Sequence, residues 1–498
     1  MRSFKHNPQL ILSYSESPFF ADRECDATGD YARDLPLRFA ITKEGVNCVP
    51  DIYNRGGFKY LTIYLPESEV PAEGDLYKDN QDKGRSKFPA IGQDGKQQVV
   101  LESKHRENKT SASLEISSLW VNCTAFPSQQ NGRAYTGYFH SSSSLLNRIW
   151  YSGAWTLQMS TIIPTEGGAL IDFNKNFDHN QAPPGGWFAN FTVAHGNVVT
   201  TDGAKRDRMV WPGDMAIAIP GIAVSTYDMI AVRNALNIIY DLQYFDGSLP
   251  YAGPPMGARG EFSDTYHLHS LLGTYYYILY TGDIDWLKTR WRAYTRALAV
   301  SISKVDDKNL LHVSSTYDWN RWGMTGHNVE ASAILYQVLE NSIDLAHWLG
   351  KKASTNGEGW ESTRSRLKSG LRTLYCPADG LFADNIGRRS CNGSEKVLPQ
   401  DGNGWVLLAN VFDGSDDADL RANVSTSLRN RWNKFGAPAP EFPNVMSPFS
   451  SSFELMGHAK ANKADAAIEL MELMWGYMLD GPGMTNSTTI EGYRTDGR

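Results

Sequence analysis

Residues 202–214, DGAKRDRMVWPGD, place three acids and two arginines within thirteen positions, ahead of a Trp-Pro-Gly turn. One protonated carboxylic acid and one ionised carboxylate are the minimum equipment for cleaving a glycosidic bond by acid–base catalysis. Neighbouring acids raise the pKa of a carboxyl group and arginines lower it, so this segment alone leaves the protonation balance open. A solvated loop held by local salt bridges is the competing interpretation. The large aromatic ring of Trp211 beside a tight turn favours a binding site.

Further segments between helical stretches also combine acids, aromatic side chains and amides. They are GEFSDTYH, STYDWNRWGMTGHN, LPQDGNGW, FPNVMSPFSSSFE and GMTNSTTIEGY. Loops of this kind carry function when a rigid scaffold positions them. We therefore expect these segments to form one end of a helical scaffold.

The composition restricts the classes of partner. The net charge of -7 argues against a nucleic-acid surface, and no apolar stretch is long enough to span a bilayer. The aromatic share of 12% is high, and indole and phenol rings suit the C–H faces of sugars. The expected partner is a carbohydrate, with neither nucleic acid nor membrane.

Secretion is the expected localisation, although the first residues, MRSFKHNPQLILSY, contain no signal-peptide core. The N-x-S/T glycosylation triplets that favour secretion lie at Asn108, Asn122, Asn190, Asn392, Asn423 and Asn486. A disulfide between Cys376 and Cys391 could close the loop that they flank. We therefore expect a secreted glycoprotein.

No metal or cofactor site is predicted. The five cysteines include no C-x-x-C pair. His267 and His269 are two residues apart, which places them on different faces of a helix. Glu330 and Glu454 lie in helical stretches and are interpreted as structural rather than catalytic.

The chain divides into two parts at about residue 136. In residues 1–136, FKYLTIYLP alternates with Leu61, Ile63 and Leu65 on one face, and SLEISSLWVNC alternates less cleanly. Short strands joined by long polar connections predict a β-sandwich.

Residues 137–498 consist mostly of helical patterns, in which apolar stretches alternate with charged amphipathic ones. This alternation predicts inner and outer helices of an (α/α)6 toroid. A superhelical solenoid is the alternative, but no repeat of fixed period supports it.

Several of these segments, taken together and in order, resemble one enzyme family. DGAKRDRMVWPGD is similar to the D-x-x-x-R-(D/E)…W-x-G-D signature of α-L-rhamnosidases, family 78 of the glycoside hydrolases, here of fungal type. TGYFHSSSSLLNRIWYSGAW, YYYILYTGDIDWL and SPFSSSFELMGHAKANKADAAIELMELMWGYML resemble further parts of its helical barrel. GMTNSTTIEGY resembles the T-T-x-x-E segment that carries the catalytic base. The resemblance covers roughly residues 137–498.

The resemblance implies an inverting hydrolase with Asp207 as general acid, usually Glu in the family, and Glu491 as general base. Asp202 is the alternative acid. The other implied sugar-binding residues are Asp202, Arg206, Trp211, Asp214, Asp264, Asp318 and Trp319. Relatives usually continue into a small β-domain, which the resemblance implies is missing here.

The predicted function is exo-hydrolysis of terminal α-L-rhamnosyl residues from glycosides or plant polysaccharide side chains. A six-hairpin glycosidase for another terminal sugar and an inactive carbohydrate-binding relative are the alternatives. A polysaccharide lyase on the same scaffold is a further alternative, and it would need a Tyr/His pair.

Overall fold

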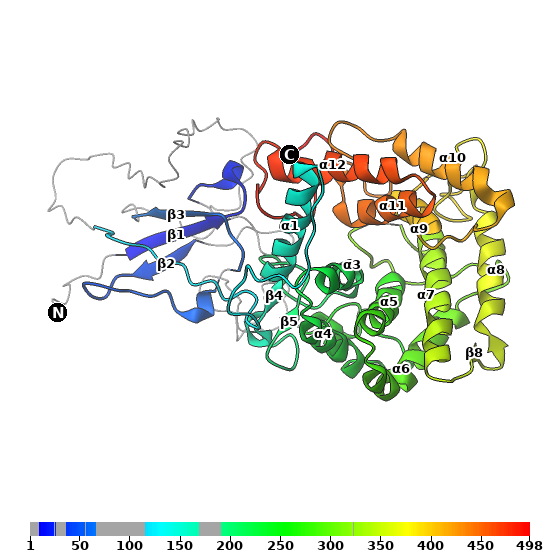
Figure 1. Ribbon diagram of the computed structural model, residues 1–498, viewed down its shortest axis with the longest axis horizontal. Coiled ribbons are helices and arrows are strands. Elements are labelled where there is room, and N and C mark those ends of the chain that lie inside the picture. Colours follow the sequence, from blue (N-terminus) through cyan, green and yellow to red (C-terminus); the bar gives the residue numbers. More distant parts are fainter. Residues whose placement is uncertain are drawn as a thin grey trace.

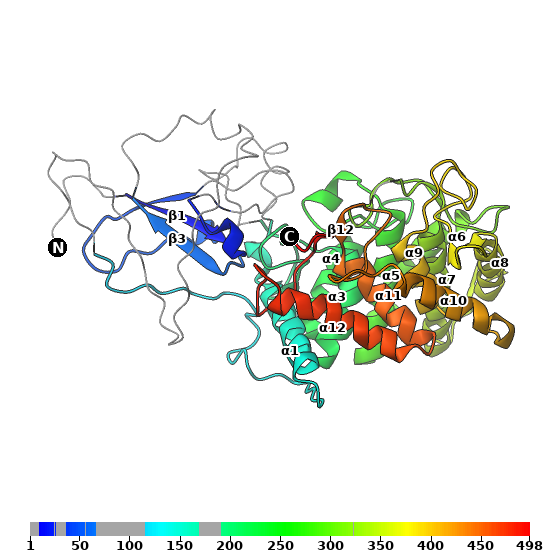
Figure 2. The same cartoon turned by 90° about the horizontal axis from the view of Figure 1, so that it is seen from above.

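The computed structural model describes residues 9–23, 25, 36–54, 56–65, 115–168, 191–321 and 323–498. Its N-terminal part is a small antiparallel sheet that projects from a larger helical part (Figures 1 and 2). No helix in the described ranges is long and apolar enough to cross a membrane.

The sheet has three strands, β1 (Gln9–Ser15), β2 (Leu37–Ala40) and β3 (Tyr60–Tyr64), in the order β2-β1-β3. Leu12 of β1 lies opposite Leu37 on one side and Ile63 on the other, and all three contribute to a small apolar core. The predicted strand at FKYLTIYLP is confirmed, although Leu65 lies beyond its end and is exposed.

The predicted β-sandwich is not observed in the described residues. The part of SLEISSLWVNC that the structure describes, residues 115–123, contains no strand, so no second sheet faces the first there. Its weak alternation is explained by exposure, because Leu119, Trp120 and Val121 all lie on the surface. The long polar loop that follows FKYLTIYLP lies outside the described residues.

The rest of the chain is mainly helical, and serine, asparagine or aspartate side chains cap many of the helices. The helices are α1 (Ser144–Met159), α3 (Pro212–Val224), α4 (Met229–Asp241), α5 (Asp264–Thr281), α6 (Ile284–Ser303), α7 (Val329–Trp348), α8 (Trp360–Arg372), α9 (Gln400–Leu408), α10 (Ala418–Arg429), α11 (Pro448–Lys460) and α12 (Ala464–Asp480).

The odd-numbered helices from α3 to α11 pack against one another in turn, and α11 also contacts α3. Of the even-numbered helices, α4 packs against α3 and α5, α6 packs against α5, and α8 packs against α7. The inner helices are the more buried, because α5, α7 and α9 are covered along most of their length, while α6 and α8 expose one side. The predicted alternation of inner and outer helices therefore describes the packing of these elements.

Short two-stranded ladders pair loop segments of this helical part. β12 (Val445–Met446), directly before α11, pairs antiparallel with β13 (Tyr493–Arg494) near the end of the described chain. The remaining short ladders are β4 (Thr161–Ile162) with β5 (Val199–Thr200), β6 (His312–Val313) with β7 (Gly326–His327), β8 (Ser354–Thr355) with β9 (Glu358–Gly359), and β10 (Tyr375–Cys376) with β11 (Leu381–Phe382).

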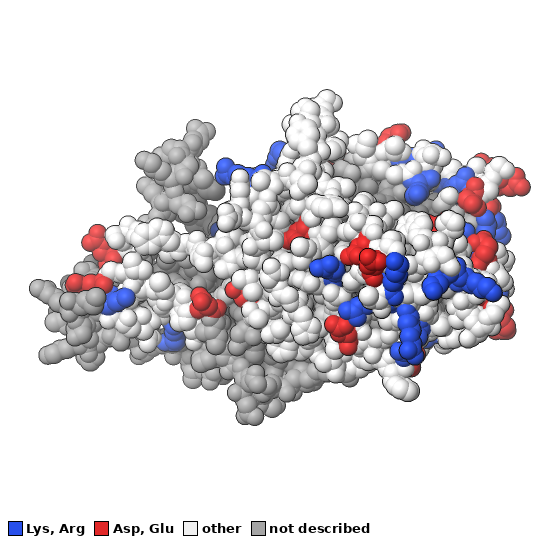
Figure 3. Space-filling model, turned by 60° about the horizontal axis from the view of Figure 1, so that its bottom comes forward, with Lys and Arg blue, Asp and Glu red and all other residues white. Residues whose placement is uncertain are grey.

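Two further features concern the cysteines and the surface. Cys376 and Cys391 form a disulfide, with a Cα–Cα distance of 5.5 Å, as their spacing suggested. On the face shown in Figure 3, acidic and basic side chains lie interspersed over the helical part, and neither sign dominates.

Candidate active site

A cavity of about 1360 Å³ opens where the loops of the helical part meet the N-terminal sheet. Its walls include all but one of the predicted site residues. These are Asp202, Arg206, Asp207, Trp211, Asp214, Asp318, Trp319 and Glu491.

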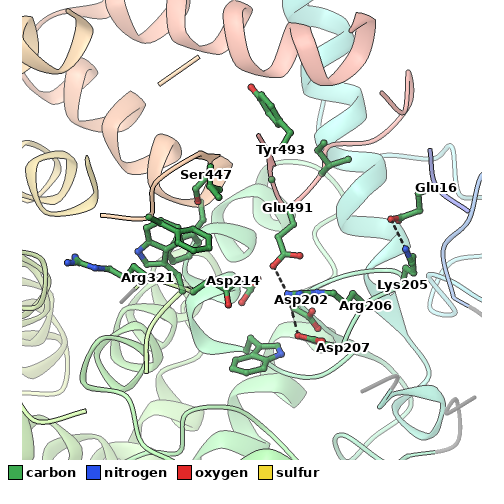
Figure 4. Close-up of a pocket in the computed structure, with 18 of the residues that line it drawn as sticks. Glu16, Asp202, Lys205, Arg206, Asp207, Asp214, Arg321, Ser447, Glu491 and Tyr493 are labelled. Carbon is green, nitrogen blue, oxygen red and sulfur yellow. Dashed lines mark hydrogen bonds and ion pairs between the residues drawn. The ribbon is translucent and has the colours of Figure 1, made fainter. Parts of the chain in front are cut away.

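The first wall is the loop between β5 and α3. Asp202 closes this loop through two hydrogen bonds with Met209. The Asp202 backbone N–H donates to the Met209 carbonyl at 3.0 Å, and the Met209 N–H donates to the Asp202 Oδ1 at 2.9 Å. Within the loop, Asp207 and Arg208 have φ angles of 57° and 54°. Left-handed backbone at two consecutive residues with side chains is uncommon, and strained positions of this kind cluster at functional sites. This turn points the buried Asp207 side chain into the cavity (Figure 4).

The second wall is the segment before β13, which carries Glu491. Its register is fixed on both sides, because the Thr489 N–H donates to the Thr156 Oγ1 at 2.9 Å and Tyr493 pairs with Met446. The Tyr493 ring is buried, and its hydroxyl donates to the Phe435 carbonyl at 2.6 Å. Although 65% of the Glu491 side chain is solvent-accessible, it faces the cavity rather than the outer surface (Figure 4).

Arg206 joins the two walls. Its Nη2 lies 2.6 Å from the Glu491 Oε1 and 3.8 Å from the Asp207 Oδ2. One guanidinium nitrogen therefore serves both predicted catalytic carboxylates, and the two oxygens cannot be farther apart than these two distances combined. Its positive charge stabilises the negative charge that a general base needs.

The acids around Asp207 have a strong tendency to hold protons. Burial raises the pKa of Asp202 well above its usual range, and the neighbouring charges of Asp207 and Asp214 raise it further. Burial, and then the charge of Glu491, raise the pKa of Asp214 to about 7. At neutral pH some of these carboxyl groups therefore stay protonated, as an acid catalyst requires.

Aromatic rings form the wall opposite the N-terminal sheet. The Trp211 ring meets Tyr251 and Tyr266 edge to face, with centroids 4.9 and 6.0 Å apart, and Tyr251 stacks on Tyr317 at 5.2 Å. The Tyr251 hydroxyl donates to the Asp318 carbonyl at 2.6 Å. A pocket with acids and an arginine on one side and rings on the other suits a sugar with hydroxyl groups and an apolar face.

A buried charge network lies behind this wall. Arg321 Nη1 lies 2.9 Å from the Asp401 Oδ2, and the same oxygen accepts the Trp319 indole N–H at 3.0 Å. Arg321 also pairs with Asp384 and lies 3.6 Å from the Glu330 Oε2. Asp401 thus fixes the Trp319 ring that faces the cavity.

This network holds more acids than cations, and burial shifts their protonation. Burial raises the pKa of Asp318 to about 7 and that of Glu441 to about 8, and it raises the pKa of Glu330 well above its usual range. Asp318, Glu330 and Asp401 are the one group of described residues with ligand atoms close enough to share a metal ion. The Arg321 guanidinium already lies among these acids, so we assign the group to charge balance rather than to metal binding.

The structure does not bring Asp264 to the cavity. This buried side chain accepts from the Lys304 ammonium and from the backbone N–H groups of Ser314 and Ser315 at 3.0 and 3.2 Å. Both oxygens are therefore engaged in holding the loop after β6, and the prediction that Asp264 contacts sugar is not supported.

Two histidines and a glutamate that the sequence analysis set aside are buried structural groups. His267 accepts from the Leu249 N–H and contacts the Ala297 carbonyl, at 3.0 and 2.9 Å. His269 is enclosed by aromatic rings. Glu454 accepts hydrogen bonds from the side chains of Trp432 and Gln400.

With this geometry described, the family assignment rests on the helical part. Residues 193–430 match the bacterial alpha-L-rhamnosidase 6 hairpin glycosidase domain. Over these residues the chain resembles a rhamnosidase-type six-hairpin glycosidase domain. Both the β5–α3 loop with its acids and the Asp318–Arg321 segment fall inside the matched range, whereas Glu491 lies beyond it.

Solved structures share the fold of this six-hairpin domain. A rhamnosidase from Klebsiella oxytoca with rhamnose bound is 19% identical with a TM-score of 0.51, and a GH78 family rhamnosidase from Bacillus sp. GL1 is 18% identical with a TM-score of 0.52. A Streptomyces avermitilis α-L-rhamnosidase complexed with L-rhamnose is 15% identical with a TM-score of 0.50. Each alignment covers 72% of this chain but only 59%, 32% and 30% of the three neighbours, respectively. None of the curated proteins matches the sequence.

The sequence analysis did not single out several residues that line the cavity. Tyr251, Tyr266 and Arg321 belong to this group, and no motif marks them as functional. Arg321 could have been suspected, because it lies three residues after Asp318 in a segment already singled out. Tyr266 likewise lies in the segment GEFSDTYH, already singled out, whereas Tyr251 carries no comparable signal in the sequence.

Proposed function

We propose that this protein is an exo-acting, inverting glycosidase that removes terminal α-L-rhamnosyl residues from glycosides or plant polysaccharide side chains. The observation that carries the proposal is the shared guanidinium of Arg206, which joins Glu491 to Asp207 in one cavity. The six-hairpin glycosidase domain, and the rhamnose bound to two of its structural neighbours, support the substrate class.

In the proposed mechanism, Asp207 donates a proton to the leaving-group oxygen, and Glu491 withdraws a proton from the water that attacks the opposite face of the sugar. Trp211 and the tyrosines behind it pack against the apolar face that carries the C6 methyl group. The raised pKa of Asp202 keeps it as the alternative proton donor. Inversion requires space for that water, which corresponds to carboxyl groups roughly 6.5–9.5 Å apart. In the structure the Arg206 contacts of 2.6 and 3.8 Å hold the Glu491 Oε1 and the Asp207 Oδ2 closer than this range, so the proposed mechanism requires the two carboxylates to separate when substrate and water enter.

A panel of p-nitrophenyl glycosides tests the substrate class. We expect release of p-nitrophenol from the α-L-rhamnoside and not from the other sugars. Release from another glycoside would assign the site to a different terminal sugar. Binding of rhamnose without turnover would indicate an inactive carbohydrate-binding relative. NMR of the first-formed anomer tests inversion, since a retained configuration would require a covalent intermediate.

We further propose that the protein folds in an oxidising, secretory compartment. Supporting observations are the Cys376–Cys391 disulfide and the exposure of the asparagine in every glycosylation triplet whose asparagine the structure describes. These triplets start at Asn122, Asn392, Asn423 and Asn486. Expression in a eukaryotic secretory host, followed by mass measurement before and after deglycosylation, tests this proposal. An unmodified, disulfide-free product would contradict it.

A further inference from the structure

The cavity is not formed by the six-hairpin domain alone. The N-terminal sheet contributes Glu16, Ser17 and Phe19, which follow β1 directly and run into the short 3-10 helix Pro18–Phe20. The wall on this side therefore consists of a segment that the family match does not include.

This segment is attached to both loops that carry the proposed catalytic acids. The Ser17 hydroxyl donates to the Gly483 carbonyl at 2.9 Å, in the loop that leads to Glu491. The Lys205 ammonium, two residues before Asp207, lies 3.3 Å from the Glu16 Oε2. The Gly57 N–H donates to the Ala204 carbonyl at 2.6 Å, which adds a second link to the acid loop. Segment 16–19 thus has a defined position relative to the site.

Phe19 presents its ring to the cavity. The side chain is 56% exposed, although it lies against the backbone of Gly483, where any Cβ would collide with the ring. Gly483 also has a φ of 79°, so a side chain there would be strained for a second reason. A phenyl ring that is held on one face and open on the other, in a cavity wall, is a stacking surface.

The position of this segment relative to the acids indicates which part of a substrate it would meet. Glu16 and Lys205 lie on one side of Asp207, and Arg321 lies on the other (Figure 4). A general acid protonates the oxygen of the leaving group, so the leaving group is on the acid's side of the terminal sugar. The volume of about 1360 Å³ exceeds the roughly 300–1,000 Å³ of ordinary ligand pockets, which leaves space for a second ring.

We infer that Glu16, Phe19 and Lys205 form the leaving-group subsite and that its occupant is a second sugar ring. The C–H face of that ring stacks on Phe19, and its hydroxyl groups contact the Glu16 carboxylate and the Lys205 ammonium. A sugar fits this wall because the wall combines one apolar face with a charged edge. The inference rests on the proposed glycosidase function and adds the class of leaving group to it.

The test compares two substrates that differ only on the leaving-group side, a rhamnosyl-glucose disaccharide and methyl α-L-rhamnoside. For Phe19→Ala, kcat/KM for the disaccharide should fall roughly fivefold to tenfold, and kcat/KM for the methyl glycoside should change by less than about twofold. Phe19→Tyr should restore the disaccharide rate. Glu16→Gln, which keeps the shape of the side chain, should again affect the disaccharide selectively.

Phe245→Ala is the matched control, because Phe245 is fully exposed and lies outside the cavity. It should leave both substrates unaffected. Equal losses on both substrates in Phe19→Ala, or no loss on the disaccharide, would overturn the subsite while leaving the hydrolase proposal standing. Failure of the wild-type protein to release rhamnose from either substrate would overturn the proposed function, and the subsite with it.

Discussion

Arg206 and Glu491 are 285 residues apart in the sequence, yet their side chains meet at 2.6 Å across the cavity. The same guanidinium nitrogen also lies 3.8 Å from Asp207. This contact places the two proposed catalytic carboxylates under the influence of one positive charge, and the predictions about the chemistry start from it.

Removing either proposed catalytic carboxylate should nearly abolish turnover. Asp207→Asn and Glu491→Gln each keep the shape of the side chain but remove its ability to transfer a proton. We expect kcat to fall roughly 10²–10⁴-fold in each variant. Hydrolysis of p-nitrophenyl α-L-rhamnoside measures the loss, and circular dichroism checks the fold. Glu469→Gln, in an exposed ion pair with Arg429, is the matched control and should keep full activity. An active Asp207→Asn variant together with an inactive Asp202→Asn variant would move the acid role to Asp202.

Arg206→Gln should change the pH dependence as well as the rate. Burial and the charge of Glu491 raise the pKa of Asp214 to about 7, while Arg206 lowers it. Without Arg206 the pKa values of Asp214 and Asp202 rise further, so the acids keep their proton to higher pH. The alkaline limb of the pH–rate profile should therefore move to higher pH, and kcat should fall on the order of 10²-fold because Glu491 loses its partner.

Arg206→Lys serves as the comparison for this prediction. It preserves the positive charge but not the planar set of guanidinium N–H donors. The alkaline limb of the pH–rate profile should therefore move less than in Arg206→Gln. A lower kcat with an unmoved alkaline limb in both variants would mean that Arg206 positions the carboxylates without setting their protonation.

Glu330→Gln should make the protein less sensitive to rising pH. The raised pKa of Glu330 in the native state means that folded protein holds a proton that unfolded protein has already released. The free energy of unfolding contributed by this group therefore falls as pH rises from the unfolded pKa, near 4.5, towards the native pKa. Gln carries no proton to lose, so the decline should be shallower in the variant. Urea unfolding at pH 5 and pH 8 gives the slope, and a slope equal to that of wild type would contradict the prediction.

The Cys376–Cys391 disulfide should contribute measurably to stability. It closes a loop with a sequence separation of 15, for which the expected contribution is about 3 kcal/mol. The Cys376→Ala/Cys391→Ala double variant should lose about this much free energy of unfolding in urea. Cys48→Ala, at an exposed free cysteine, should not. A wild-type protein whose unfolding is unchanged by a reducing agent would refute the contribution.

The helices and most of the cavity could be predicted from the sequence because they depend on local patterns. Apolar spacing marks the buried faces, and capping residues such as Ser143 and Asn328 mark where helices begin. The acid loop could be recognised because Asp202, Arg206 and Asp207 are close together in the chain.

The features that could not be predicted depend on contacts between distant segments. Asp264 has the same residue type and a similar setting to Asp318, and only the position of Lys304 shows that it is engaged elsewhere. The predicted β-sandwich is not observed in the described residues, because alternation at 115–123 reflects an exposed extended chain as well as it reflects a strand. The contribution of Phe19 to the cavity depends on how the sheet is placed against Gly483, which no local pattern encodes.

Arg321 constrains how a site of this kind can diverge. It is paired with Asp401 and Asp384 and lies beside Glu330, all out of contact with water, so exchanging Arg321 would leave these buried acids without charge compensation. A tolerated change in this buried charge network would need several simultaneous substitutions. New specificities would therefore arise more readily at the rim, where residues such as Phe19 can be replaced singly without disturbing the charged interior.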